Sequence, residues 1–138
     1  EPTSLRQHDK QTGIACGLNK VSVIMPAYNA EPFIQEAIDS VLSQTHSNLE
    51  LIIVDDGSTD RTLAIATNSA KADNRVKVIS IGHSGNNAAA RNLGVKNSSG
   101  EFISFLDADD VFEPDALEKA TQYLNQHTHI EAVYGLLR

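Results

Sequence analysis

The sequence predicts an α/β fold, a three-layer sandwich built around a mainly parallel central sheet. Strand-like and helix-like segments alternate along the chain, which is typical of parallel strands joined by right-handed crossovers. The strand-like segments are rich in apolar residues, as expected for strands covered on both faces. Polar residues collect directly after several of these strands, where open α/β sheets bind their ligands.

The 138 residues are enough for one domain with a real core, and 41% hydrophobic and 21% charged residues are ordinary for a soluble globular protein. A net charge of −7 argues against nucleic-acid binding, which usually needs a basic surface. The single cysteine, Cys16, excludes an internal disulfide framework. No membrane-spanning run or secretory signal is visible, so we expect a cytoplasmic protein.

Residues 1–20 are polar and lack a clear period, and we expect a flexible lead-in before a domain that covers residues 21–138. The first predicted strand covers residues 21–25 and ends at Pro26. Asn29 can cap the helix that follows, because asparagine accepts backbone N–H groups at helix starts. Apolar residues then recur at the spacing of a helix with one buried face: Ile34, Ala37, Ile38, Val41 and Leu42.

A second strand is predicted over residues 49–54, which form a nearly continuous apolar run. Asp60 can cap a helix that runs to about residue 72. Residues 76–81 predict a third strand, and the glycines that follow predict a loop over residues 82–85.

Residues 87–95 predict a helix with Ala88 and Leu93 on its inner side. The fourth strand is predicted over residues 101–106, and a fifth over residues 130–134. The helix between them has an apolar stripe that consists of Leu117, Ala120, Tyr123 and Leu124.

Asp107, Asp109 and Asp110 place three carboxylates within four residues, directly after the fourth predicted strand. Like charges repel at this spacing, and such crowding favours a bound cation. Mg²⁺ and Mn²⁺ prefer oxygen ligands, and Mg²⁺ typically combines one or two carboxylates with substrate phosphates. The pattern therefore predicts a divalent ion that carries a phosphorylated ligand. A solvated acidic turn that caps the next helix is the alternative.

Other polar residues at the same predicted edge also have two interpretations. Asp55 or Asp56 could accept hydrogen bonds from a base or a ribose, or stabilise the start of the next helix. Tyr28 could stack on a nucleobase, although a lone aromatic residue more often serves packing. Arg91 could bind diphosphate oxygens, or face solvent, or pair with a nearby aspartate.

Five segments, in this order, resemble the motifs of family 2 glycosyltransferases, which have the GT-A (nucleotide-diphospho-sugar transferase) fold. They are residues 21–29, 43–45, 53–60, 90–94 and 105–110. The resemblance extends over about residues 20–134, nearly all of the chain that shows a clear pattern.

The resemblance implies that the chain binds a nucleotide-diphospho-sugar, usually one linked to UDP. The backbone around Pro26 and Ala27 and the ring of Tyr28 would contact the base. Asp56 would hydrogen-bond the base, and Asp55 would support the same loop.

The same resemblance implies the contacts to the rest of the donor. Arg91 would lie near the ribose or the diphosphate, and Asp107 would hold the ribose or the sugar side. Asp109 would bind Mn²⁺ or Mg²⁺, which bridges the two phosphates and neutralises the charge of the leaving nucleoside diphosphate.

In this family the catalytic base and most of the acceptor site come from a later segment, and only 28 residues follow Asp110. We therefore expect a truncated, donor-binding half that binds nucleotide but transfers sugar poorly by itself. The acceptor would be a glycan, a lipid or another hydroxyl compound, as in polysaccharide biosynthesis, and the family expectation is inversion. Homo-oligomerisation and peripheral membrane association of the full-length protein stay open.

Three other interpretations fit parts of the sequence. Asp107 and Asp109 match the D-x-D-x-[TV] pattern of haloacid-dehalogenase-like phosphatases, with Asp107 as nucleophile, but that motif normally opens the chain. In a receiver domain an acidic pair would cradle Mg²⁺, but here the pair follows the second strand rather than the first, and the expected lysine is missing. A non-catalytic binding domain is the third.

Overall fold

The computed structural model describes residues 4–6, 19–127 and 132–133, and these residues form alternating strands and helices. Cys16, most of the expected lead-in and most of the expected fifth strand lie outside the described residues. In chain order the elements are β1 (Ser4–Arg6), β2 (Val21–Ala27), α1 (Ile34–Leu42), β3 (Leu49–Asp56), α2 (Thr62–Ala72), β4 (Val76–Ile81), α3 (Asn87–Lys96), β5 (Phe102–Phe105), α4 (Ala116–Gln126) and β6 (Ala132–Val133).

The described strands form one sheet in the order β4-β3-β2-β5-β1-β6. The pairs β2–β3, β2–β5 and β3–β4 are all parallel. β1 is antiparallel to both β5 and β6. The prediction of a mainly parallel sheet is confirmed, whereas the strand Ser4–Arg6 was not predicted because three residues carry no readable period.

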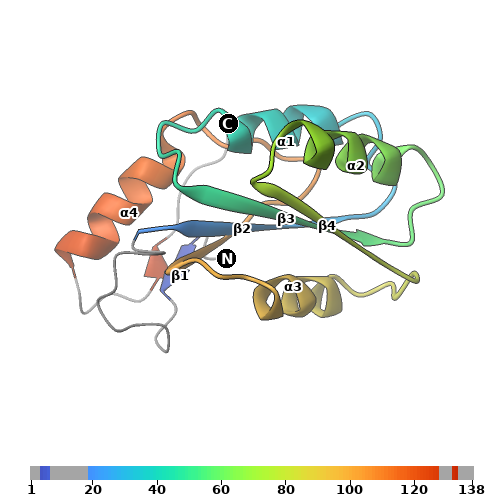
Figure 1. Cartoon of the computed structure of the whole chain (residues 1–138). Coiled ribbons are helices and arrows are strands. Elements are labelled where there is room, and N and C mark those ends of the chain that lie inside the picture. The colour runs from blue at the N-terminus through green and yellow to red at the C-terminus, as the bar shows by residue number, and fades with distance from the viewer. Residues whose placement is uncertain (1–3, 7–18, 128–131, 134–138) are drawn as a thin grey trace.

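Helices cover both faces of the parallel strands, with α1 and α2 on one face and α3 on the other (Figure 1). The larger core lies on the first face, where Met25 and Ile53 from the sheet pack in one cluster with Ile34 of α1 and Leu124 of α4. The second core, under α3, is built around five buried side chains: Ile24, Ile52, Val54, Ala90 and Ile103. This arrangement confirms the predicted α/β sandwich.

α3 packs closely on β2 because it presents Gly94 to the sheet. A Cβ atom at position 94 would collide with Cγ2 of Ile24, so only glycine lets the helix approach this far. The close approach fixes α3, and with it Arg91, against the strand that precedes Tyr28.

The strand β2 continues through Pro26 to Ala27, so the prediction that Pro26 ends it was wrong. Proline lacks the N–H that an interior strand needs. Leu106 donates its N–H to the carbonyl of Ile24 at 3.0 Å, and the chain leaves the sheet after that bond. The backbone polar groups of residues 24 and 26 are directed to the same side of β2, the side of β5. Pro26 lies beyond the end of β5, so its missing N–H costs no hydrogen bond of the sheet.

The helix α1 begins at Ile34, and Asn29 does not cap it. Asn29 instead has a positive φ of 47°, and its side-chain oxygen accepts the N–H of Thr59 at 2.8 Å. The predicted apolar face of α1 is confirmed, because Ile34 and Ile38 are fully buried. Arg61, and not Asp60, is the N-cap residue of α2, but the Asp60 carboxylate still accepts the N–H of Thr62, the first residue of that helix, at 2.9 Å.

Two residues predicted to face the interior lie at the surface. Ala88 is exposed in the first turn of α3, where Ala90 and Gly94 provide the buried face. Tyr123 is 43% exposed and stacks on His127, while Thr121 takes a buried place in α4. The spacing of apolar residues locates the buried face of a helix only to within one residue. The predictions for these two side chains, which lie at the margin of that face, were therefore wrong.

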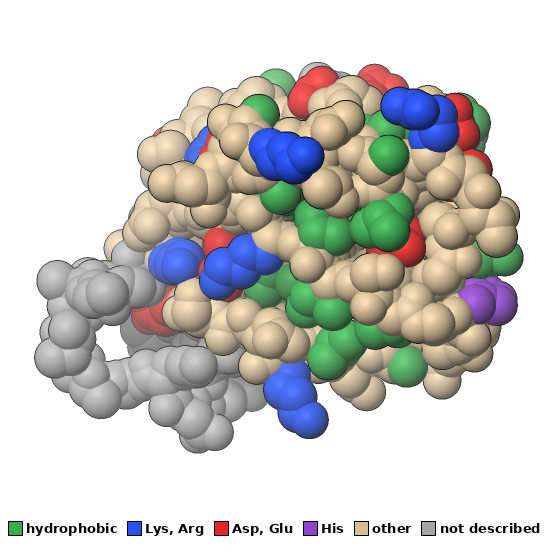
Figure 2. Space-filling view, turned by 45° about the vertical axis from the view of Figure 1, so that its right-hand side comes forward, with side chains coloured by type: hydrophobic (Ala, Val, Ile, Leu, Met, Phe, Trp, Pro, Cys, Tyr) green, Lys and Arg blue, Asp and Glu red, His purple; other side chains and the backbone are tan. Residues whose placement is uncertain are grey.

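The surface carries charges of both signs. Figure 2 shows Lys and Arg side chains spread among other groups on the face in view, rather than gathered into one basic area. This distribution agrees with the mixed charges of the sequence. In the described ranges, none of the helices combines the length and the apolar content that a membrane span requires.

Candidate functional site

The carboxyl ends of β2, β3, β4 and β5 meet at one edge of the sheet. Their register makes this explicit, because Ala27 lies opposite Asp55, and Asp56 lies opposite Ile81. All four strands therefore end at the same edge, and the polar segments that follow them lie together there.

Tyr28 follows β2 and presents its ring at the surface, with 45% of the residue exposed. The ring stacks on that of His83, with centroids 4.3 Å apart and planes inclined by 22°. Pro26 and Ala27 are buried directly before it, so the backbone that carries the ring is fixed by the sheet. His83 comes from the loop after β4, and this contact joins two of the polar segments.

A second set of contacts joins the loop after β2 to the loop after β3. The Asn29 N–H donates to Oγ of Ser58 at 2.9 Å, and the Asn29 side chain accepts from Thr59. The N–H of Ala30 donates to Oγ1 of Thr62 at 2.8 Å. The turn that carries Tyr28 is therefore anchored by several hydrogen bonds on the β3 side.

Asp55 and Asp56 are both buried at the end of β3, and their carboxylates bind different segments. Oδ2 of Asp55 accepts the N–H of Ser58 at 3.3 Å, while its Oδ1 is buried without a hydrogen-bond partner among the described residues. Oδ1 of Asp56 accepts the N–H of Ser84 at 2.8 Å. The opposed directions follow from strand alternation.

Asp56 is held in its charged form. The backbone hydrogen bond from Ser84 lowers the pKa of the Asp56 carboxyl, and the nearby imidazole of His83 adds to that effect. Nδ1 of His83 lies 3.0 Å from the carbonyl oxygen of Asp56 and 3.5 Å from its Oδ2. A fixed, ionised carboxylate of this kind can accept an N–H from a planar heterocycle.

Arg91 reaches the same edge from α3. Its guanidinium lies 5.6 Å from the centre of the Phe105 ring, and Nη2 is 3.5 Å from Oδ1 of Asp107. The pairing with an aspartate was one of the three interpretations of Arg91 that the sequence left open. Packing on Phe105 orients the planar guanidinium, which then meets the acidic loop at its first residue.

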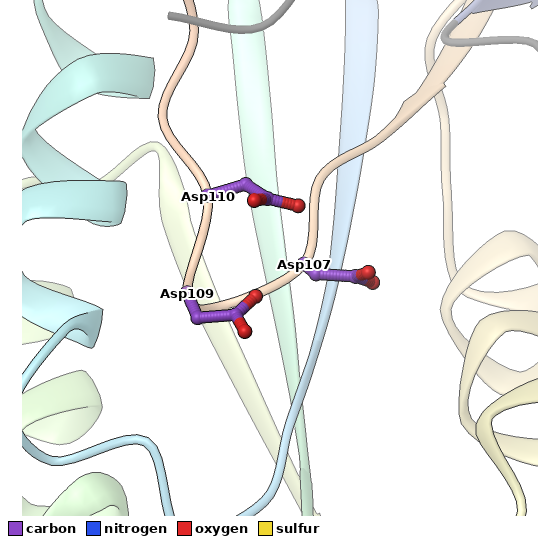
Figure 3. Close-up of side chains that lie close together, drawn as sticks. All are labelled: Asp107, Asp109 and Asp110. Carbon is purple, nitrogen blue, oxygen red and sulfur yellow. The ribbon is translucent and has the colours of Figure 1, made fainter.

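Asp107, Asp109 and Asp110 form the acidic cluster. All three come from the loop after β5 and project to the same side of it (Figure 3). One ligand oxygen from each carboxylate lies within 4.8 Å of the others. Burial raises the pKa of Asp110, and the charges of Asp109 and Asp107 raise it further. The cluster thus holds excess negative charge that a divalent cation would relieve.

The acidic loop is held by a bond of its own, from the Asp110 N–H to the Asp107 carbonyl at 3.0 Å, and by contacts from α1 and the turn after it. Oγ of Ser40 accepts the N–H of Phe112 at 3.1 Å. The buried amide of Gln44 donates to the carbonyl of Glu113 at 2.7 Å and accepts the N–H of Leu117 at 3.0 Å. The motif at residues 43–45 therefore positions the chain that leaves the acidic cluster.

The residues predicted from the sequence fall into two groups at this edge. Tyr28 and Asp56 lie together through His83, and Arg91 lies with the acidic cluster through Asp107. His83 and Ser84 were not predicted as site residues, because neither belongs to a periodic pattern. The glycines at positions 82 and 85 were the available signal that this loop is shaped for close contact.

Comparison with known proteins places the chain in context. The family model described as "Glycosyl transferase family 2" matches residues 22–136. An uncharacterized glycosyltransferase of Haemophilus influenzae is 42% identical over 115 residues, which is 83% of this chain and 46% of that protein. The chain therefore spans less than half the length of this relative.

Solved structures agree with the sequence matches. S. aureus TarS 1-349 in complex with UDP-GlcNAc superposes with a TM-score of 0.73 at 35% identity, over 79% of this chain and 32% of that one. The mannosyltransferase PcManGT from Pyrobaculum calidifontis, in complex with GDP-Man and Mn²⁺, gives a TM-score of 0.67 at 27% identity, over 84% and 36% of the two chains.

Proposed function

The chain belongs to glycosyl transferase family 2, and from this premise we propose that it binds a UDP-linked sugar at the carboxyl edge of its sheet. The observation that carries the proposal is the convergence of Tyr28, Asp56 and the acidic cluster, from three different strands, on that edge. A nucleotide-diphospho-sugar offers a flat base, a ribose and two phosphates, which match an aromatic ring, a carboxylate and a cation site in turn.

The base would lie against Tyr28 and meet Asp56. Stacking on an exposed aromatic ring is worth roughly 1–3 kcal/mol per base, and it is tolerant of base identity. Asp56 supplies the selectivity, because its carboxylate accepts an N–H such as that of uracil. The backbone at Pro26 and Ala27 would border the base, and Asp55 would support the turn through Ser58.

The ribose and the diphosphate would extend towards β5. Asp107 would accept a hydroxyl hydrogen bond from the ribose or the sugar, and Arg91 would approach the diphosphate. TarS of S. aureus has been solved with UDP-GlcNAc, which supports a uridine donor for a related chain.

The acidic cluster fits a divalent ion, because its carboxylates lie together and repel one another. Asp109 would be the principal ligand for Mn²⁺ or Mg²⁺, with Asp107 and Asp110 beside it. When bound, such an ion neutralises charge on the leaving nucleoside diphosphate. The structure of PcManGT with Mn²⁺ supports this choice of metal for a related chain.

In the whole protein, the oxygen of an acceptor hydroxyl would form a bond to the anomeric carbon of the sugar. The bond from that carbon to the β-phosphate oxygen would break, and the nucleoside diphosphate would leave with the electron pair. A carboxylate base outside the residues named here would take the hydroxyl proton, and attack opposite the leaving group would invert the configuration.

The base preference gives the first test of this proposal. Isothermal titration calorimetry with UDP, GDP and dTDP, each with Mn²⁺, should give the tightest binding for UDP. Tighter binding of GDP would overturn the uracil assignment while preserving the donor site. If a folded sample binds none of the three, the donor site itself is wrong.

A further inference from the structure

His83 occupies a place that a nucleobase would need. Its imidazole covers one face of the Tyr28 ring at a centroid distance of 4.3 Å. Two stacked rings at this separation leave no room for a third ring between them. A base that stacks on the same face of Tyr28 must therefore displace the imidazole.

The His83 ring also lies against Asp56, the residue proposed to meet the base, although its hydrogen bond goes to the backbone carbonyl and not to the carboxylate. Nδ1 lies 3.0 Å from the Asp56 carbonyl oxygen, and a carbonyl can only accept, so Nδ1 carries the hydrogen. The same Nδ1 is 3.5 Å from Oδ2 of Asp56. One planar ring thus stacks on Tyr28 and directs an N–H towards Asp56 at the same time.

The backbone of His83 is fixed, whereas its side chain can leave. A Cβ atom at Gly57 would collide with the backbone of His83, and Gly57 has a φ of +74°, so the two turns are in tight contact. The N–H of Ser84 is bound by Asp56. The His83 side chain, in contrast, is 49% exposed and has solvent to rotate into.

We infer that the His83 side chain closes the base subsite of the ligand-free chain, because it covers the face of Tyr28 on which the donor base would stack and lies beside the Asp56 carboxylate that the base would reach. This inference rests on the proposed donor site. His83 is a gate of the site and not a catalytic residue, because it must leave before the base can enter. The donor then binds only the fraction of molecules in which the ring has rotated away, which weakens the apparent affinity.

The test is calorimetric titration of UDP with Mn²⁺ into the wild-type chain and His83→Ala. Removing the gate should tighten Kd roughly three- to tenfold, since a stacked pair with one hydrogen bond is being removed. His127→Ala is the matched control, because His127 stacks on Tyr123 at 4.1 Å in α4, and it should change nothing.

A second measurement follows the ring itself. In the wild-type chain with ¹³C-labelled histidine, adding UDP should shift the His83 ring signals as the shielding by Tyr28 is lost, while the His127 signals stay in place. Equal or weaker UDP binding by His83→Ala, with wild-type binding intact, overturns the gate and leaves the donor site standing. Absence of UDP binding by both folded proteins overturns the donor site, and the gate with it.

Discussion

The backbone N–H of Ser84 donates to Oδ1 of Asp56 at 2.8 Å, which ties the end of β3 to the loop after β4. The bond does two things. It lowers the pKa of the Asp56 carboxyl, and it fixes the direction in which the second carboxylate oxygen points. An acid that is ionised and rigid needs no rearrangement to accept a hydrogen bond from a ligand.

Asp56→Asn should weaken UDP binding about tenfold, because a charge-assisted acceptor becomes a neutral amide. Its fold should survive, since the amide oxygen can still accept the N–H of Ser84. Calorimetry gives the Kd, and Asp115→Asn is the control, because Asp115 pairs with Lys119 at the surface of α4. An equal loss of UDP affinity in both variants would contradict a specific role for Asp56.

Arg91→Gln should weaken binding of UDP while leaving uridine almost unaffected, since Arg91 is proposed to approach the diphosphate and not the base. A loss of about five- to twentyfold for UDP is expected for one contact between a guanidinium and phosphate oxygens. Parallel titrations of UDP and uridine measure the difference. A similar loss for both ligands would mean that Arg91 acts by supporting the acidic loop through Asp107.

Glu50 is a buried acid at the opposite edge of the sheet from the site. Burial by itself would raise its pKa, but hydrogen bonds from Ser22, Ser99 and Lys77 and the charge of Lys20 outweigh burial and lower the pKa to about 2. The Ser22 hydroxyl donates to Oε2 at 2.6 Å. The carboxylate thereby links β2, β3, β4 and the turn before β5.

A lowered pKa means that the ionised form stabilises the fold. This stabilisation is complete above about pH 4.5 and is lost as the pH falls towards 2. Glu50→Gln should lower the free energy of unfolding at pH 7 by about 2 kcal/mol, and the difference from wild type should shrink below pH 4. Urea unfolding between pH 7 and pH values below 4 measures the difference in the free energy of unfolding, and Glu36→Gln, at an exposed position, is the control. A difference that does not depend on pH would show that packing, and not charge, is what Glu50 provides.

Gln44 positions the acidic loop from the turn after α1, and its amide nitrogen donates to the carbonyls of Ser40 and Glu113. Gln44→Glu keeps the shape but replaces that donor with an acceptor, so two carbonyls lose their partner. The free energy of unfolding should fall by about 2 kcal/mol, and Mn²⁺ should bind more weakly. Gln35→Glu, on the exposed side of α1, should change the free energy of unfolding by less than about 0.5 kcal/mol. Equal stability of the two variants would refute this positioning role.

Much of the fold was predictable because it depends on local pattern. The strand at residues 76–81 and the buried face of α1 follow directly from apolar spacing. The contacts between loops were not predictable in this way. Asn29 was expected to act within its own helix, but it bonds Thr59, thirty positions further along. No local pattern encodes such a pairing.

The candidate site shows the same division. Carboxylates at the ends of buried strands were visible in the sequence, and the pairing of β2 with both β3 and β5 places the two acidic segments at the same edge of the sheet. His83 carried no such signal, because its contacts with Tyr28 and Asp56 exist only once three separate loops meet. The ligand-binding roles of all the site residues stay predictions: Pro26, Ala27, Tyr28, Asp55, Asp56, Arg91, Asp107 and Asp109.

The most direct test of the donor site is the metal dependence of UDP binding. UDP is titrated calorimetrically into the wild-type chain and into Asp109→Asn, with Mn²⁺ and again with EDTA. Our account predicts that Mn²⁺ strengthens UDP binding to the wild-type chain at least tenfold and that Asp109→Asn loses this gain. UDP affinity that is the same with Mn²⁺ and EDTA, or a gain from Mn²⁺ that Asp109→Asn retains in full, would contradict it.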